Sequence, residues 1–155
     1  MKRLIRSTLM MFTTAIGFAL ALPAAAQFAK PEDAVKYRKA AMTIMAAHFG
    51  RVAAMASGKA PFDAKAAAEN AEVATAMSKL PFVAFIDGTD KGDTRAKPEI
   101  WSQADKFKAG ATKMQDDMAK LNVAAKSGSL DAIKAAVGDT GKACKGCHDD
   151  YRKEQ

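Results

Sequence analysis

Residues 130–151, with the sequence LDAIKAAVGDTGKACKGCHDDY, carry the pattern from which the fold can be predicted. Apolar or chemically distinctive side chains recur along this stretch at steps of three, four or seven residues, the spacing of one face of an α-helix. Two glycines weaken the helix in its middle, but the spacing continues across them. We therefore predict one helix over the whole stretch. Its stripe consists of Leu130, Ile133, Val137, Cys144, Cys147, His148 and Tyr151.

Three further helical segments are predicted upstream of this one. Pro31 suits the first turn of a helix, because the N–H that proline lacks is not needed there. Asp63 is a favourable N-cap for the second segment, and Ser102 with Asp105 resembles a capping box at the start of the third. The three segments cover residues 31–58, 63–80 and 102–126.

Residues 81–98 break the helical pattern with prolines, glycines and charges, so we predict a loop there. It is longer than an ordinary connector, which suggests that it covers something. Phe82 and Phe85 lie at its start. No useful β-alternation is present along the chain. The sequence thus predicts an all-α fold, an antiparallel four-helix bundle formed by residues 27–155 as a single domain.

The string Cys144-Lys145-Gly146-Cys147-His148 is the attachment signature of c-type haem. Residues three and four apart share a helix face, so both thiols can form thioethers with the vinyl groups along one haem edge. The imidazole of His148 then points under the iron as an axial ligand. We predict one covalently bound haem c with His148 on the iron.

Three other interpretations of the two cysteines fit less well. A thioredoxin-like pair belongs at the start of a helix after a strand, whereas this motif ends a helical stripe. A zinc site needs a fourth ligand, and His48 is the one histidine left to supply it. A disulfide between Cys144 and Cys147 would close a very small loop and leave His148 without a role.

The side of the iron opposite His148 decides the function. His48 falls away from the face of Met42, so we predict a surface or hydrogen-bonded histidine. Methionines on an apolar stripe usually pack in the core, which is the default interpretation of each one here. Besides His48, the candidates for the second iron face are Met42, Met45, Met55, Met77, Met114 and Met118.

Arg38 lies on the apolar stripe of the first segment, four residues before Met42. An arginine in that place needs an anion, which a haem propionate would supply. Alternatively, its side chain extends to solvent at the end of the bundle. Lys39 and Arg95 are weaker candidates for the propionates, since both could be solvated. The stripe also holds Val35, Met45, Ala46, Phe49 and Ala53.

Residues 1–26 are predicted to be a secretory signal peptide, cleaved after Ala26. Three basic residues precede an apolar run from Leu9 to Leu22, and small residues follow it. The run is shorter than a membrane-spanning helix, which disfavours an uncleaved anchor. Cleavage would leave 129 of the 155 residues in the periplasm. It would also lower the formal net charge from +7 to +4, because the signal holds three basic residues and no acid.

The lysines of the remaining chain are spread rather than clustered, the pattern of a solvated surface. Such a mild positive charge is compatible with an acidic redox partner protein. A nucleic-acid partner is not expected of an exported chain without a basic cluster, and no membrane association is expected after signal cleavage.

These features together resemble cytochrome c′, the class II c-type cytochromes whose haem is attached near the C-terminus. The resemblance covers essentially the whole chain after residue 26. It rests on residues 27–33 (QFAKPED), 37–41 (YRKAA), 98–102 (PEIWS) and 144–152 (CKGCHDDYR).

The resemblance implies a left-handed bundle, usually a homodimer through the first two helices, with the iron bound by His148 alone beneath an apolar pocket. Arg38 matches an arginine that contacts a haem propionate in this family. Arg152 matches a basic residue beside the proximal face, while Phe82 and Phe85 match aromatic residues near the haem edge.

Met42 separates two functional hypotheses. It stands where the family places its distal pocket residue. In that role Met42 would not bind the iron, which would stay open to nitric oxide and carbon monoxide and could also transfer electrons. In related low-spin class II cytochromes, however, the methionine of an Arg-x-x-x-Met string binds the iron, which would make the protein an electron carrier only. The resemblance favours the first hypothesis. An enzyme such as a peroxidase is not expected, because the distal stripe lacks a histidine–arginine pair that could cleave peroxide.

Overall fold

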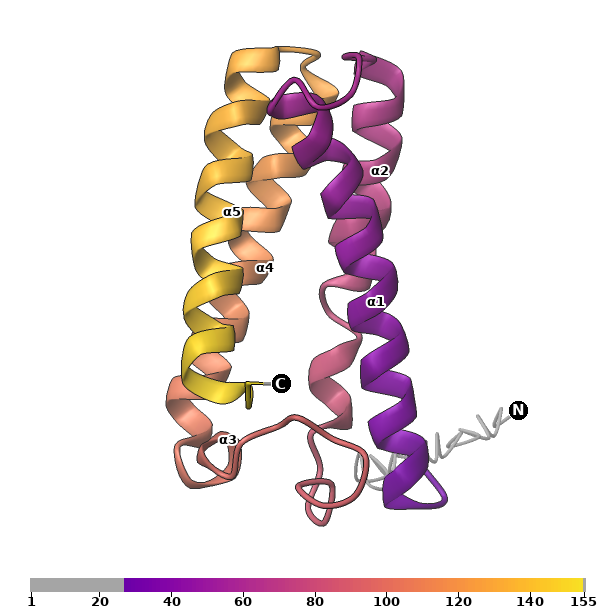
Figure 1. Cartoon of the computed structure of the whole chain (residues 1–155), viewed down its shortest axis with the longest axis vertical. Helices are drawn as coiled ribbons and strands as arrows, with labels where there is room; N and C mark the ends of the chain where they lie inside the picture. Colours follow the sequence, from indigo (N-terminus) through magenta and orange to yellow (C-terminus); the bar gives the residue numbers. More distant parts are fainter. Residues whose placement is uncertain (1–26, 155) are drawn as a thin grey trace, which may run out of the picture.

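The computed structural model describes residues 27–154, and the predicted signal peptide lies outside this range. Four long helices lie side by side and alternate in direction, which confirms the predicted all-α antiparallel bundle (Figure 1). A 3-10 helix, η2, and a one-turn helix, α3, lie in the long connection between the second and third of them. The elements are α1 (Pro31–Ala56), α2 (Ala64–Met77), η2 (Pro81–Ala84), α3 (Glu99–Ser102), α4 (Ala104–Lys126) and α5 (Leu130–Tyr151).

The helices pack most closely in sequence order, α1 against α2, α2 against α4, and α4 against α5. The remaining side of the bundle, between α1 and α5, is less extensively packed. In the view of Figure 1, α1 and α5 lie close together at one end and separate toward the end that holds α3. The C-terminal turns of α5, which carry the cysteine motif, therefore lie at the more open end.

Two of the predicted helix starts are confirmed by their capping bonds. The carboxylate of Asp63 accepts a hydrogen bond from the backbone N–H of Ala66 at 2.9 Å. The hydroxyl of Ser129 accepts from the N–H of Ala132 at 3.3 Å, at the start of α5. Each bond satisfies one of the N–H groups that the first helical turn leaves without a partner. Despite the two glycines in its middle, Gly138 and Gly141, α5 then runs unbroken to Tyr151.

The sequence prediction was wrong at three points. The second helix ends at Met77 rather than at residue 80, because the chain turns there into η2. Ser102 does not cap α4: it ends α3, and the backbone of Gln103 departs from helical geometry before α4 begins. Ala46 is exposed although we placed it on the inner stripe. Propensity and spacing alone do not fix such boundaries to within two residues.

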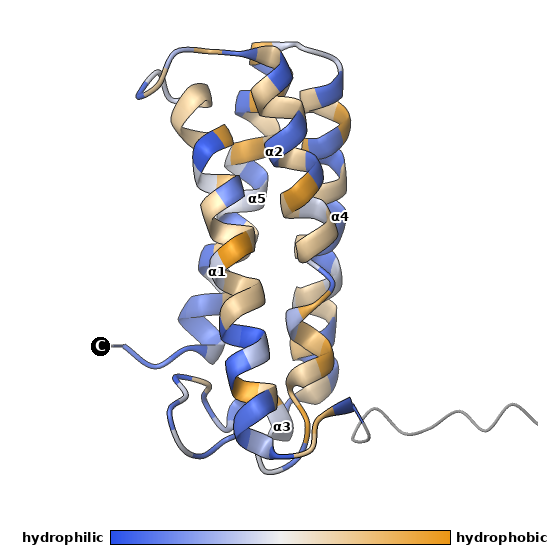
Figure 2. Cartoon of the chain, turned by 90° about the vertical axis from the view of Figure 1, so that its right-hand side faces the viewer, coloured by the Kyte–Doolittle hydropathy of each residue, from blue (hydrophilic) through white to orange (hydrophobic). Residues whose placement is uncertain are grey.

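The bundle interior consists of two groups of apolar side chains. Apolar and polar segments alternate along each helix, so the helices turn one face inward (Figure 2). The end cluster, at the end of the bundle near α3, is formed by Ala96, Ile100, Phe107 and Tyr151. The main core cluster consists of Met45, Val52, Met55, Ala56, Ala67, Ala71, Ala74, Met114, Met118, Leu121, Ala125 and Ile133. Within residues 27–154, no helix combines the length and the apolar character that crossing a membrane requires.

One carboxylate is buried in α4. Asp117 is 3% exposed, and its oxygens accept hydrogen bonds from Lys113 at 2.6 Å and Lys120 at 3.3 Å. The hydrogen bond from Lys113 is the main reason that the pKa of Asp117 lies below its ordinary value. Because both lysines are largely exposed, water weakens each ion pair and the net stabilisation is modest.

We expect Asp117→Asn to lower the free energy of unfolding by about 1 kcal/mol at pH 7. Because the pKa of Asp117 is lowered in the folded state, its carboxylate stabilises the fold fully only when the pH is above its pKa in the unfolded chain, which is about 4. That contribution disappears as the pH falls through the folded-state pKa. Urea unfolding at pH 7 and at about pH 3 measures both effects, with the exposed Asp116→Asn as the control. An equal loss of unfolding free energy at both pH values would contradict the lowered pKa of Asp117.

Candidate functional site

The C-x-x-C-H motif lies on the last two turns of α5, on a face that other helices cover only in part. Along α5, all of which the structure describes, the buried residues are Ile133, Thr140 and Tyr151. Cys144 and Cys147 are half-buried, and His148 is exposed. An inner stripe that ended in ordinary core packing would be buried at these positions as well. The partly uncovered face fits residues that hold a large group.

The two cysteines contact different parts of the interior. Cys144 packs against the main core cluster, as do the half-buried Met42 and Met77. Cys147 packs against the end cluster. Phe82 touches both clusters, so the motif and this ring span the junction between them. A flat apolar group attached through both sulfurs would therefore meet apolar side chains along its whole edge.

The protonation of the three groups suits attachment and ligation. Burial raises the pKa of both thiols, so they are neutral in the folded chain. The pKa of His148 is lowered, first by partial burial of its ring and second by the positive charge of Arg152. A neutral imidazole is the form that binds a metal, and the lowered pKa extends that form toward acidic pH.

Arg38 is buried among loop residues and does not extend to solvent, which corrects one of the two interpretations of this side chain. It is 3% exposed. Its guanidinium donates to the carbonyl of Ala84 at 3.2 Å, to the hydroxyl and carbonyl of Thr89 at 2.8 and 2.6 Å, and to the hydroxyl of Thr94 at 2.8 Å. It also lies 4.3 Å from the centre of the Phe85 ring, within cation–π range.

We expect Arg38→Leu to destabilise the folded protein by about 3 kcal/mol, because several buried acceptors in the loop would lose their donor. Thermal or urea unfolding measures this loss. Lys39→Leu is a matched control, since Lys39 is exposed and binds Asp93 of the same loop through a surface ion pair. It should cost less than about 0.5 kcal/mol. Equal effects of the two substitutions would show that the buried network contributes little.

The remaining charged residues predicted for the site are held by protein partners. Lys39 donates to Asp93 at 2.6 Å. Arg95 donates to the carbonyl of Lys153 through two nitrogens, at 2.9 and 2.6 Å. Arg152 is exposed just after the end of α5, where its charge acts on the imidazole of His148. Arg95 and Arg152 are thus brought to the end of α5, whereas Lys39 lies over the loop.

The aromatic residues and His48 are also placed by direct contacts. The ring of Phe85 packs edge-on against Phe107 at 4.9 Å between centroids, and Phe82 lies 5.7 Å from the same ring. His48 forms a hydrogen bond with Asn70 of α2 at 2.9 Å. This bond confirms the prediction of a hydrogen-bonded histidine away from the face of Met42.

Sequence reasoning missed the loop residues that join this end of the bundle. The hydroxyls of Thr89 and Thr94 accept hydrogen bonds from the guanidinium of Arg38, and the ammonium of Lys97 donates to a carbonyl near the end of α5. The indole N–H of Trp101 donates to the carbonyl of Ile86 at 3.3 Å. None of these residues belongs to a periodic pattern. Their partners are distant in sequence, so only the unusual length of the loop indicated that it had a role.

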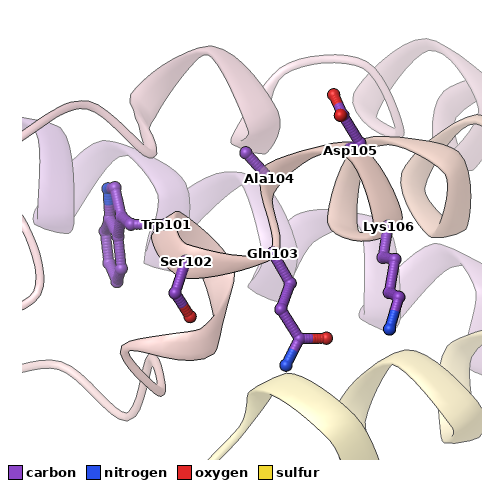
Figure 3. A pocket seen from close by; sticks show the side chains of 6 residues that line it. All are labelled: Trp101, Ser102, Gln103, Ala104, Asp105 and Lys106. Atoms are coloured by element: carbon purple, nitrogen blue, oxygen red, sulfur yellow. The ribbon is translucent and has the colours of Figure 1, made fainter.

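A surface depression of about 410 Å³ lies where α3 meets α4. Trp101 to Lys106 line it, and the side chains of Ser102, Gln103 and Lys106 project to the same side (Figure 3). It includes none of the residues predicted for the site. The depression is a consequence of the break in the helix at Gln103.

A helical bundle with this motif on its last helix defines a c-type cytochrome whose haem is attached near the C-terminus. The family model of cytochrome c′ matches residues 33–152. This chain therefore belongs to the cytochrome c′ family. Proteins of this family carry covalent haem c, and the two cysteines that such attachment needs are present here.

Individual relatives agree with this assignment. Cytochrome c′ from Rubrivivax gelatinosus is 58% identical over 129 residues, which are 83% of this chain and 100% of that protein. Its crystal structure matches with a TM-score of 0.80, covering 82% of this chain and 100% of the other. The nitric oxide complex of a mutant cytochrome c′ from Alcaligenes xylosoxidans is 52% identical, with a TM-score of 0.78, and covers 83% of this chain and 99% of that one.

Proposed function

We propose that this protein is a periplasmic cytochrome that binds nitric oxide and carbon monoxide at a five-coordinate haem iron and also transfers electrons. The observation that carries the proposal is the C-x-x-C-H motif on a partly uncovered face of α5, in a chain 58% identical to a cytochrome c′. Cys144 and Cys147 form the two thioethers, and His148 is the axial ligand. When bound, the haem supplies the iron site for a diatomic gas and for one-electron redox change.

The chain's own residues make the site selective. Met42, Met77 and Phe82 are half-buried and pack against the same apolar cluster as Cys144. The donors that could stabilise bound dioxygen are engaged elsewhere, since Arg38 binds the loop and His48 binds Asn70. A pocket of this kind admits nitric oxide and carbon monoxide without offering dioxygen a hydrogen bond. The same engagement of Arg38 and His48 is our reason to propose a non-enzymatic role. Solved relatives that include a nitric oxide complex support the choice of ligand.

One specific observation favours a second candidate function. The half-buried Met42 and Cys144 pack against the same core cluster, so a methionine side chain is available in the interior that the motif borders. If Met42 binds the iron, the site is six-coordinate and the protein transfers electrons only. The identity of 58% to a cytochrome c′ supports the open site.

The roles of several further residues and the cellular setting are part of the proposal. Arg152 acts beside the proximal face, where its charge already influences His148. Arg38 serves the propionates through its Nε–H, because its bonds to the loop use Nη1 and Nη2, with Lys39 and Arg95 as weaker contributors. Phe82 and Phe85 pack near the haem edge.

Export with cleavage after Ala26 would leave 129 residues, the same length over which the Rubrivivax gelatinosus protein matches in full. We also propose a homodimer through α1 and α2, where Tyr37 and Ile44 are exposed apolar side chains. The electron-transfer partner would be an acidic protein of the periplasm, in keeping with the mildly basic mature chain.

Absorption spectra of the purified protein, oxidised and reduced, before and after addition of carbon monoxide, test the proposed function. We expect a broad, unsplit reduced band that shifts with carbon monoxide. His148→Ala should abolish this spectrum while leaving the haem attached through the two cysteines. Sharp, split bands that do not shift on addition of carbon monoxide would instead identify a six-coordinate haem and an electron-transfer protein. A native spectrum that persists in His148→Ala would overturn the ligand assignment.

We expect Met42→Ala to keep the haem attached and to leave the iron high-spin, because Met42 is a wall residue and not a ligand in this proposal. Magnetic susceptibility and the position of the visible bands report the spin state. Met55→Ala, the same substitution on the same helix but within the main core, controls for general loosening of the bundle. A change from low to high spin in Met42→Ala alone would establish Met42 as the second ligand.

A further inference from the structure

The loop between α2 and α4 links α1 to α5, the two neighbouring helices that pack least extensively, through one threonine. The hydroxyl oxygen of Thr94 accepts a hydrogen bond from the guanidinium of Arg38 at 2.8 Å. The same oxygen accepts from the backbone N–H of Ala96 at 3.1 Å. Thr94 is half-buried, so water competes little for either bond. It therefore fixes the backbone of residues 94–96 directly to α1.

The next three residues hold the C-terminal end of α5. Ala96 forms an isolated antiparallel bridge with Arg152. The backbone N–H of Lys97 donates to the carbonyl of Tyr151 at 3.0 Å, and its ammonium donates to the carbonyl of Asp149 at 2.8 Å. On the other side, the N–H of Lys153 donates to the carbonyl of Arg95 at 2.8 Å. Together with the two bonds from Arg95 to Lys153, these contacts cap the helix from outside.

This cap matters because a helix leaves its last carbonyl groups without partners inside the helix, and such ends fray. His148 lies in the last turn of α5, and its own carbonyl accepts from the N–H of Arg152. The last turn can hold a fixed orientation only while Asp149, Tyr151 and Lys153 stay bound to the loop. The loop in turn depends on Arg38, which lies on α1 four residues before Met42.

We propose that Thr94 and Arg38 are positioning residues for His148, acting through the loop that caps the last turn of α5. The proposal rests on the assignment of His148 as the axial ligand. Neither residue needs to touch the imidazole. Together they limit how far the last helical turn can open, and so they fix the direction from which the imidazole approaches the iron. The side of the bundle that carries Met42 and the side that carries His148 are then mechanically coupled.

Thr94→Val tests the proposal, because valine keeps the shape of threonine and removes the shared acceptor. Thr94→Ser is the matched control, since serine keeps the hydroxyl. We expect hydrogen–deuterium exchange of the amides in residues 95–97 and 149–154 of the holoprotein to become roughly three- to tenfold faster in Thr94→Val, the effect of losing one net hydrogen bond. Thr94→Ser should exchange at nearly the wild-type rate. Amides at the start of α5, such as that of Ile133, should not change and serve as an internal control.

The second readout is the iron–histidine stretching band in the resonance Raman spectrum of the ferrous protein. We expect this band to broaden or shift in Thr94→Val and to keep its wild-type form in Thr94→Ser. Arg38→Lys, which keeps the charge and loses the forked donor geometry, should give the same two changes as Thr94→Val. Lys36→Ala, an exposed change on the same helix, should give neither.

Unchanged exchange at the end of α5 in Thr94→Val would overturn the proposal, as would faster exchange with an unaltered iron–histidine band. A uniform increase that includes Ile133 would also overturn it, since the effect would then be global destabilisation. The exchange measurement does not depend on iron ligation. A failure of the proposed function, seen as a native spectrum in His148→Ala, is therefore distinguishable from a failure of this inference.

Discussion

Arg38 places a full positive charge inside a helical bundle, where a charge without partners would be strongly unfavourable. The loop between α2 and α4 removes that cost by surrounding the guanidinium with carbonyl and hydroxyl oxygens and with the face of Phe85. This arrangement constrains both the guanidinium of Arg38 and the loop. The guanidinium fixes a loop that has little regular structure of its own, and the fixed loop can then serve as a surface for the end of α5.

The same constraint explains how the site can be apolar although charged residues lie nearby. A guanidinium that is hydrogen-bonded to the loop cannot also point into the space beside Met42. His48 is withheld in the same way by Asn70. Arg38 and His48 thus stabilise the fold, and the half-buried residues that pack with Cys144 against the main core cluster are methionine, phenylalanine, alanine and valine. This separation of roles is the basis for our proposal of a site selective for small, weakly polar ligands.

The parts of the molecule that could be predicted from sequence are those with local causes. Helix α5 follows from its stripe, the starts of α2 and α5 follow from Asp63 and Ser129, and the haem motif follows from the spacing of its cysteines. The break at Gln103 and the early end of α2 could not be predicted, because packing of the loop overrides local propensity there.

The hydrogen-bond partners of Arg38 could not be predicted from the sequence for a related reason. The position of Arg38 on the apolar stripe of α1 indicated that its guanidinium needs hydrogen-bond acceptors. Those acceptors are backbone carbonyls and threonine hydroxyls about 50 residues away. Such groups occur throughout any chain, and no composition or spacing marks them. From the sequence we expected Arg38 to meet a haem propionate or solvent, and the structure shows hydrogen bonds from its guanidinium to the loop.

The cap on α5 also bears on the order in which the chain folds. The bonds that complete it join residues far apart in sequence, with separations of 56 residues for Arg38 and Thr94 and 58 for Arg95 and Lys153. Contacts of such long range form late, because much of the chain must first be ordered. We therefore expect the final turn of α5 to be among the last parts to become rigid, which would keep both thiols accessible after the rest of the helix has formed. A protein whose cofactor must be joined covalently gains from this delay, since attachment can precede closure of the fold around it.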